Sequence, residues 1–183
     1  MISKEEHADL PIRRYEGEVC LVTTSQDVER ARADFRHEKV VGFDTETRPS
    51  FRKGDVHLPC LVQAATARSV YLFQLRRMEV IPILHELLAE TRIVKAGVGL
   101  DYDLRQLQQV FPFTVRSVLD LGTVARRNHL GQTGVRNLAG LLLRFLRRRH
   151  QAHLALVAAD RQIGELFFRN HLIAVTNEGD DYG

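Results

Sequence analysis

Two acidic residues, Asp44 and Glu46, lie two positions apart at the end of the apolar run Val40–Phe43. The run is typical of a buried strand, and side chains alternate between the faces of a strand, so both carboxylates point the same way. Two such carboxylates repel each other and lose hydration. Mg²⁺ or Mn²⁺ would relieve both costs, because these ions prefer carboxylate, phosphate and water oxygens. The pair indicates metal-assisted phosphoryl chemistry, although the same pattern also occurs in solvated turns and helix caps.

A third acid, Asp103, is placed by a separate pattern. It belongs to a segment that is expected to run from a strand into a helix, where it shares one face with three apolar residues. That face consists of Leu100, Asp103, Leu104 and Leu107. An inward-pointing carboxylate is costly unless it is paired or bound to a metal ion. Two interpretations stay open: a third metal ligand, or an acid hydrogen-bonded to buried backbone groups or an arginine.

The neighbours of Asp103 are expected to behave differently. Asp101 falls on the other side of the helix, where Arg105 at i+4 can form an ion pair with it. Gly97 and Gly99 allow close approach of backbones where the strand turns into the helix. The sequence therefore predicts one surface acid and one acid that is directed at the core.

Strands and helices must position these acids. Strands are expected over residues 17–23, 39–46, 60–66, 69–73 and 92–96. Helices are expected after Ser25, which can cap the first one, around residues 81–88, and over residues 100–110, 122–130, 135–148 and 153–169. This order predicts an α/β domain with a mixed central sheet flanked by helices. Sites in such sheets gather at strand ends, where Asp44 and Glu46 are expected.

The composition fits a single globular domain. The chain has 183 residues, of which 44% are hydrophobic and 27% charged, so a sizeable core is expected and extensive disorder is not. Residues 1–14 are expected to be a polar lead-in, and residues 15–183 one domain. The formal net charge of +3 permits a nucleic-acid partner without requiring one.

The two cysteines, Cys20 and Cys60, show neither disulfide nor metal-ligand spacing. Reduced thiols and a cytoplasmic setting are expected. The first ten residues lack the apolar core of a signal peptide, and no stretch approaches the length of a membrane span. No membrane partner is therefore expected.

Several segments together resemble the DEDD-type 3′–5′ exonucleases, and the ribonuclease D-like branch in particular. Asp44-x-Glu46 after an apolar strand, followed by Gly97 and Asp103-Leu104, resembles the first two motifs of that family. Leu61–Ala64 resembles its second strand and Asn137–Ala139 its later helix. The resemblance covers roughly residues 17–146.

This resemblance implies a ribonuclease H-like fold and hydrolysis of nucleotides from the 3′ end of single-stranded RNA or DNA. Four acids would hold two divalent cations, Mg²⁺ or Mn²⁺. Two ions about 3.5–4 Å apart can activate a water and stabilise the leaving oxygen. By resemblance, Asp44 would bridge both ions, Glu46 would hold one and help orient the water, and Asp103 would hold the other.

The last motif of the family is only partly matched. Asp160 is the candidate for the fourth acid. The family places a tyrosine four residues earlier or a histidine five residues earlier, and these positions hold Leu156 and Ala155. His153 lies two helical turns before Asp160 and can be read either as a replacement base or as a surface histidine. The segment of residues 147–152 is also about twenty residues shorter than in ribonuclease D-like chains.

Aromatic and basic side chains near these motifs are candidates for nucleic-acid contacts. They are Phe51, Arg52, Lys53, Arg147 and Arg148. Two functions remain open: a 3′–5′ exonuclease, or a catalytically weak or inactive relative that serves as a nucleic-acid-binding or assembly module. The sequence does not decide between RNA and DNA, and it leaves the oligomeric state open, with a homo-oligomer compatible.

Overall fold

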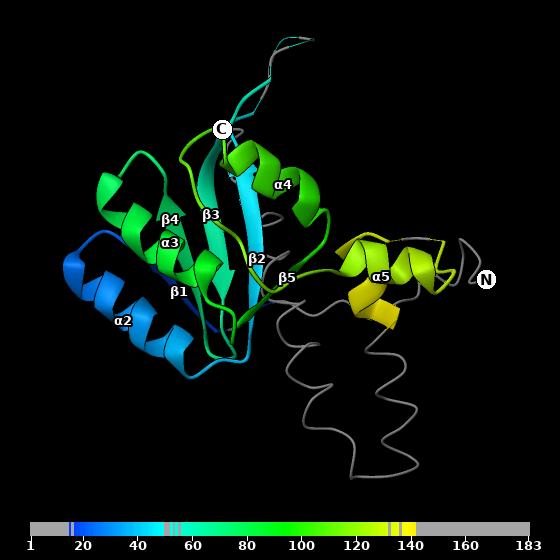
Figure 1. Cartoon of the computed structure of the whole chain (residues 1–183), viewed down its shortest axis with the longest axis horizontal. Coiled ribbons are helices and arrows are strands. Elements are labelled where there is room, and N and C mark those ends of the chain that lie inside the picture. Colours follow the sequence, from blue (N-terminus) through cyan, green and yellow to red (C-terminus); the bar gives the residue numbers. More distant parts are fainter. Residues whose placement is uncertain are drawn as a thin grey trace, which may run out of the picture.

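The computed structural model describes residues 15, 17–49, 52, 54, 56–131, 133–135 and 137–141 (Figure 1). Its strands are β1 (Glu18–Leu21), β2 (Val40–Thr47), β3 (Pro59–Ala65), β4 (Ser69–Gln74), β5 (Val94–Gly97) and β6 (Val118–Asp120). Its helices are α2 (Ser25–Arg36), α3 (Ile81–Ala89), which follows the short 3-10 helix η1 (Met78–Val80), α4 (Leu100–Leu107) and α5 (Leu121–Arg127). Residues 137–141 are also helical.

The six strands form one sheet in the order β1-β4-β3-β2-β5-β6. β3 runs antiparallel to both β2 and β4, whereas β1 pairs parallel with β4. On the other side of β2, β5 pairs parallel with β2, and β6 pairs parallel with β5. The predicted mixed sheet is therefore confirmed, and β2 lies inside it between β3 and β5.

The sequence prediction missed β6 and misplaced the first helix cap. β6 has three residues, too few for a periodic signal, and it becomes a strand by pairing with β5. Thr24, rather than Ser25, is the N-cap of α2: its hydroxyl accepts a hydrogen bond from the Asp27 N–H at 3.2 Å. The Asp27 carboxylate in turn accepts from the Thr24 N–H at 2.9 Å, which completes a capping box.

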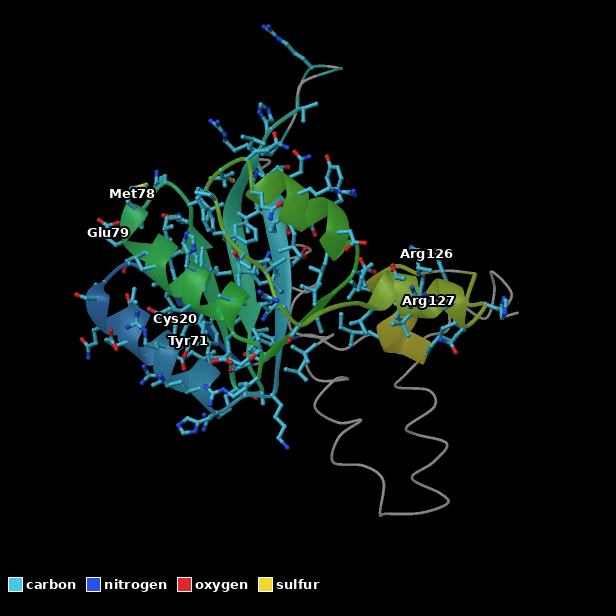
Figure 2. The ribbon with its side chains drawn as sticks, in the orientation of Figure 1. Cys20, Tyr71, Met78, Glu79, Arg126 and Arg127 are labelled. Atoms are coloured by element: carbon cyan, nitrogen blue, oxygen red, sulfur yellow. The ribbon has the colours of Figure 1, made fainter. Side chains whose placement is uncertain are left out.

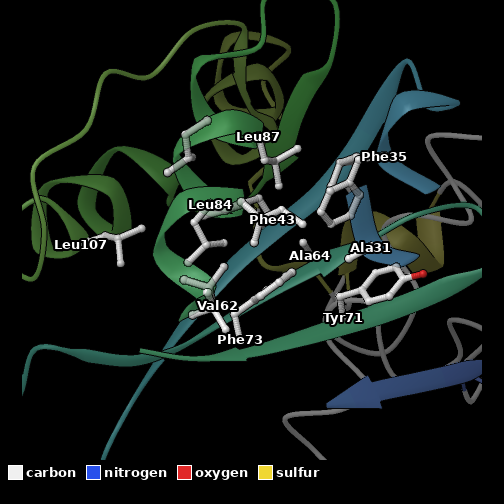
Figure 3. Packing of buried hydrophobic residues seen from close by; sticks show 14 of the residues in the cluster. Ala31, Phe35, Phe43, Val62, Ala64, Tyr71, Phe73, Leu84, Leu87 and Leu107 are labelled. Carbon is white, nitrogen blue, oxygen red and sulfur yellow. The ribbon is translucent and has the colours of Figure 1, made fainter. Parts of the chain in front are cut away.

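The main hydrophobic cluster lies on one face of the sheet. α2 and α3 contact each other over this face, and Figure 3 shows Phe35 and Leu84 packed towards Phe43. Phe35 also meets Tyr71 edge to face, with ring centroids 5.5 Å apart. Fully buried strand residues on this face include Val41, Phe43, Val62, Ala64, Tyr71 and Phe73.

Strand alternation places the next residues of β2 on the opposite face. Phe43 is opposite Ala64 in the antiparallel ladder, and Asp44 is opposite Gln63. Because residues directly opposite each other share a face, Asp44 and Gln63 lie together on the face opposite the main core cluster, which also carries the small buried cluster of Ala65 and Val70. No helix among the described residues is long and apolar enough to cross a membrane.

Candidate active site

Asp44 is a partly buried carboxyl in the interior of the sheet. Burial raises the pKa of Asp44 to about 7, and the negative charges of Asp103 and Glu46 add to that rise. The backbone N–H of Thr45 donates to Asp44 Oδ1 at 2.9 Å and acts in the opposite direction. The Asp44 carboxyl therefore lies near two other acids, Glu46 and Asp103. The two-residue spacing in the strand had predicted this for Glu46.

Asp103 reaches the same region from α4. Burial raises its pKa to about 6, while a hydrogen bond with the Thr45 side chain lowers it and the charge of Glu46 raises it. Leu100, Leu104 and Leu107 are buried, so the predicted apolar face of α4 is confirmed. Asp103 is half-buried at the margin of that face.

Two glycines set the path from β5 into α4. Gly99 is the N-cap of α4 with φ +79°, a left-handed conformation that other residues rarely adopt. At Gly97, an added Cβ would lie 2.3 Å from the Phe43 backbone oxygen. The close approach of this turn to β2 brings the start of α4 to the acids of the strand.

Asp101 faces solvent, as the helix periodicity predicted, and differs in this from Asp103. The predicted ion pair with Arg105 was wrong: between the described residues Asp101 and Arg105 the structure forms no salt bridge. Both side chains are exposed, where an ion pair gains little over two hydrated charges. The i, i+4 spacing places the two side chains within reach of each other, but at an exposed position it does not make the ion pair favourable enough to form.

Sequence reasoning missed Asp120 at the end of β6. It pairs with Gly97 in the ladder, and its negative charge contributes to the raised pKa of Asp103. Asp120 Oδ1 also accepts from the Thr123 N–H at 2.8 Å and so caps α5, the helix that carries Arg126 and Arg127 in its last turn (Figure 2). An aspartate just before a helix is a capping signature, and this signal could have located the residue.

Gln63 was also missed as a member of the site. It is only 1% exposed. Its Nε2 donates a hydrogen bond to Glu46 Oε1 at 3.2 Å. The sequence displayed it only as part of an apolar strand, with no indication that it contacts an acid of the neighbouring strand.

The acids fit a hard divalent cation in chemistry but are not arranged as a finished cage. Their oxygens are the ligands that Mg²⁺ and Mn²⁺ prefer. The ionised carboxylates of Asp44 and Asp103 repel each other, and a cation bound between them would offset this repulsion. Even so, no group of three or more His, Cys, Asp or Glu side chains in the described part of the chain is placed to hold an ion. Side-chain rotation or additional ligands would be needed.

Several predicted residues lie outside the description. Asp160, Phe51, Lys53, Arg147 and Arg148 are among them, and Arg52 is described as exposed.

Away from the acids, a cavity of about 440 Å³ lies between α2, α3 and the turn after α3. It is lined in part by Arg32, Arg36 and Glu86, and none of the three acids reaches it.

Known proteins resemble this chain at low identity. A 3′–5′ exonuclease of Drosophila ananassae is 28% identical over 160 residues, which are 80% of this chain and 44% of that protein. The EXD2 exonuclease domain, in a crystal structure soaked in Mn, is 26% identical with a TM-score of 0.51, covering 82% of this chain and 87% of that domain. The catalytic core of RRP6 from Trypanosoma brucei has a TM-score of 0.59 at 17% identity, covering 96% and 55%.

These matches bear on fold and family to different degrees. The RRP6 core supports the fold alone, and the predicted ribonuclease H-like fold is confirmed. The chain spans less than half the length of the curated relatives it matches. A family model described as 3′–5′ exonuclease matches residues 19–169, which is most of the chain. The chain therefore belongs to the 3′–5′ exonuclease domain family.

Proposed function

We propose that this chain is a divalent-metal-dependent exonuclease that hydrolyses phosphodiester bonds at the 3′ end of single-stranded RNA or DNA. One observation carries the proposal: Asp44, Glu46 and Asp103, from two different elements, interact through their charges beside β2. Structural ion-pair networks neutralise such acids with Arg or Lys. The charged groups that raise the pKa values of Asp44 and Asp103 are instead other carboxylates.

In this proposal Asp44, Glu46, Asp103 and Asp160 hold Mg²⁺ or Mn²⁺. The bound ions would supply an activated water and stabilise the leaving oxygen. The charges of Asp44, Glu46 and Asp103 act on one another, so the three carboxylates are close enough to be proposed as ligands of one site. Glu46, held by the Gln63 amide, is suited to orienting the attacking water. The exonuclease domain soaked in Mn supports the choice of cation.

The nucleic-acid strand would approach over the basic segment that follows β2. Arg52 is exposed there, and Phe51, Lys53, Arg147 and Arg148 are proposed as further contacts. Phosphate contacts of this kind contribute affinity that falls as salt concentration rises. Binding should therefore weaken with salt irrespective of base sequence.

A second candidate is a non-catalytic relative that binds nucleic acid or serves as an assembly module. The observation that favours it is the last motif, where Leu156 and Ala155 occupy the family's tyrosine and histidine positions. A positioned general base typically contributes roughly 10²–10⁴-fold to rate. An enzyme without one should be slow yet detectable, whereas a binding module should show no turnover.

The deciding experiment follows single-stranded RNA and DNA that carry a 5′ label. With Mn²⁺, the parent protein should shorten at least one of them by single nucleotides from the 3′ end, and EDTA should stop it. Asp44→Asn should leave the substrate intact, while Glu79→Gln, which removes an exposed carboxylate of η1 (Figure 2), should behave like the parent. If the parent shortens neither substrate but retains them in a binding assay, the non-catalytic candidate is correct.

A further inference from the structure

Gln63 occupies a position between two of the proposed metal ligands. In the antiparallel β2–β3 ladder it stands directly opposite Asp44, and Leu61, two residues earlier on the same face, stands opposite Glu46. Side chains directly opposite each other lie close together, and the diagonal neighbour is within reach of a long side chain. The Gln63 amide is thus built into the sheet beside both carboxylates.

The hydrogen bond to Glu46 fixes the orientation of this amide. An ionised carboxylate only accepts hydrogen bonds, so the Nε2 side of Gln63 must face Glu46. Gln63 Oε1 then points elsewhere, and it is buried without a hydrogen-bond partner in the part of the chain that the structure describes. The side chain is 1% exposed, so bulk water does not compensate for the missing bond.

This arrangement is unfavourable for folding alone. A buried acceptor without a donor loses its hydration and gains nothing in return. An apolar side chain of similar volume would avoid that loss, and the next buried residue on the same face of β3, Ala65, is apolar and packs with the fully buried Val70. Fold stability therefore does not account for glutamine at this position.

We infer that Gln63 is a positioning residue of the active site, which holds the Glu46 carboxylate in the orientation that a divalent cation and its water require. This inference rests on the proposed function. Hydrogen bonds from a second layer of residues restrict ligand side chains, and their removal typically weakens metal binding 10–100-fold. Gln63 acts here through Glu46 and does not itself bind the cation.

A double-mutant cycle tests whether the effect passes through Glu46. Gln63→Met keeps the approximate shape of the side chain and removes its donor, and Glu46→Gln removes the carboxylate. The Kd for Mn²⁺ is measured by calorimetry for the parent, both single variants and the double variant. Gln63→Met should raise the Kd roughly 10–100-fold in the parent background and leave it nearly unchanged in the Glu46→Gln background. The Tm of the Gln63→Met single variant should equal or exceed that of the parent.

Gln74→Leu is the matched control, because Gln74 is a half-buried glutamine of the adjacent strand that accepts from Arg77 Nε at 3.3 Å. It should leave the Kd for Mn²⁺ unchanged. In the shortening assay, Gln63→Met should lower kcat with little change in the KM for the nucleic acid. Equal effects of Gln63→Met in both backgrounds would assign Gln63 to the fold and overturn the inference.

Three further outcomes are decisive. If Gln63→Met and Gln63→Leu both fail to fold while Gln74→Leu folds, Gln63 is structural and the inference is wrong. A parent that binds Mn²⁺ as tightly as its Gln63→Met variant removes the inference and leaves the proposed function standing. A parent that neither binds Mn²⁺ nor shortens nucleic acid removes both.

Discussion

The two faces of β2 and β3 differ in what burial does to them. On one face, Phe43 and Ala64 are opposite each other, fully buried and packed under α2 and α3. On the other, Asp44 is opposite Gln63, with a carboxyl whose pKa is raised and an amide oxygen that has no partner in the described structure. One residue of displacement along the strand separates the two environments.

This difference shows how a small domain combines stability with chemistry. The apolar face gains free energy from the surface it buries. The polar face loses free energy, because burial and neighbouring acids oppose the ionised carboxylates that a cation needs. The rigidity of the first face is what allows the second to hold like charges close together.

The largest effects should separate the two faces completely. Phe43→Ala should destabilise the protein by about 3–5 kcal/mol, since it leaves a cavity in the core. Asp44→Asn should match or exceed the parent in stability, because it removes a charge that burial disfavours, and it should lose metal-dependent shortening. Urea denaturation and the nuclease assay measure the two properties. A destabilised Asp44→Asn that still shortens nucleic acid would contradict the division of roles.

The next comparison uses two acids of the same helix. Asp103→Asn should abolish nuclease activity and leave stability unchanged or increased, because the carboxyl it replaces has its pKa raised to about 6. Asp101→Asn should keep activity and change stability by well under about 1 kcal/mol, as expected at an exposed position. Single-turnover rates and thermal unfolding measure both variants. Equal loss of activity in the two would show that the charge of the helix, rather than the position of Asp103, matters.

The acids were predictable from sequence because their patterns are local. Alternation along a strand placed Asp44 and Glu46 together, and helical periodicity separated Asp103 from Asp101. β6 and Asp120 escaped because the strand is defined by its pairing with β5, across more than twenty intervening residues. Gln63 escaped for the same reason: its contact with Glu46 depends on the β2–β3 register, which the strand's own sequence does not specify. The missing Asp101–Arg105 pair shows that spacing alone does not make a contact.

The stability of the protein should change with pH because of the two acids whose pKa values are raised. The pKa of Asp44 is raised to about 7 and that of Asp103 to about 6, so the folded state holds these protons more tightly than the unfolded state. Their contribution is fully present below about pH 4 and is lost as pH rises through 6 and 7. Without divalent cations, Tm should therefore decrease from pH 5 to pH 8 by more in the parent than in Asp44→Asn.

Other shifted carboxyls do not interfere in that window. The pKa values of Asp27 and Glu90 are lowered to about 2, so they change stability only at lower pH. Saturating Mn²⁺ should raise the Tm of the parent at pH 8. The extra fall in Tm between pH 5 and pH 8 that distinguishes the parent from Asp44→Asn should then largely disappear. A parent and variant with the same pH slope would show that the Asp44 carboxyl is not held in a strained ionisation state.

The smallest expected effect concerns Thr45, which belongs by alternation to the apolar face yet contacts the acids. A hydrogen bond with its side chain lowers the pKa of Asp103, against the effect of burial. Thr45→Val keeps the side-chain shape and removes that hydrogen bond, so the ionised form of Asp103 loses one stabilising interaction. A single hydrogen bond contributes about 0.5–1.5 kcal/mol net, which is up to about one pH unit.

The pH at which Mn²⁺ binding is half complete should accordingly rise by no more than about one unit in Thr45→Val. Calorimetry across pH measures this midpoint, and Thr47→Val, at the exposed end of β2, is the control that should leave it in place. A midpoint that shifts downward would mean that Thr45 opposes ionisation of Asp103. Thr45 would then belong to the apolar face alone. An upward shift would show instead that a residue of the apolar face stabilises the ionised form of Asp103, at the point where α4 brings Asp103 to β2.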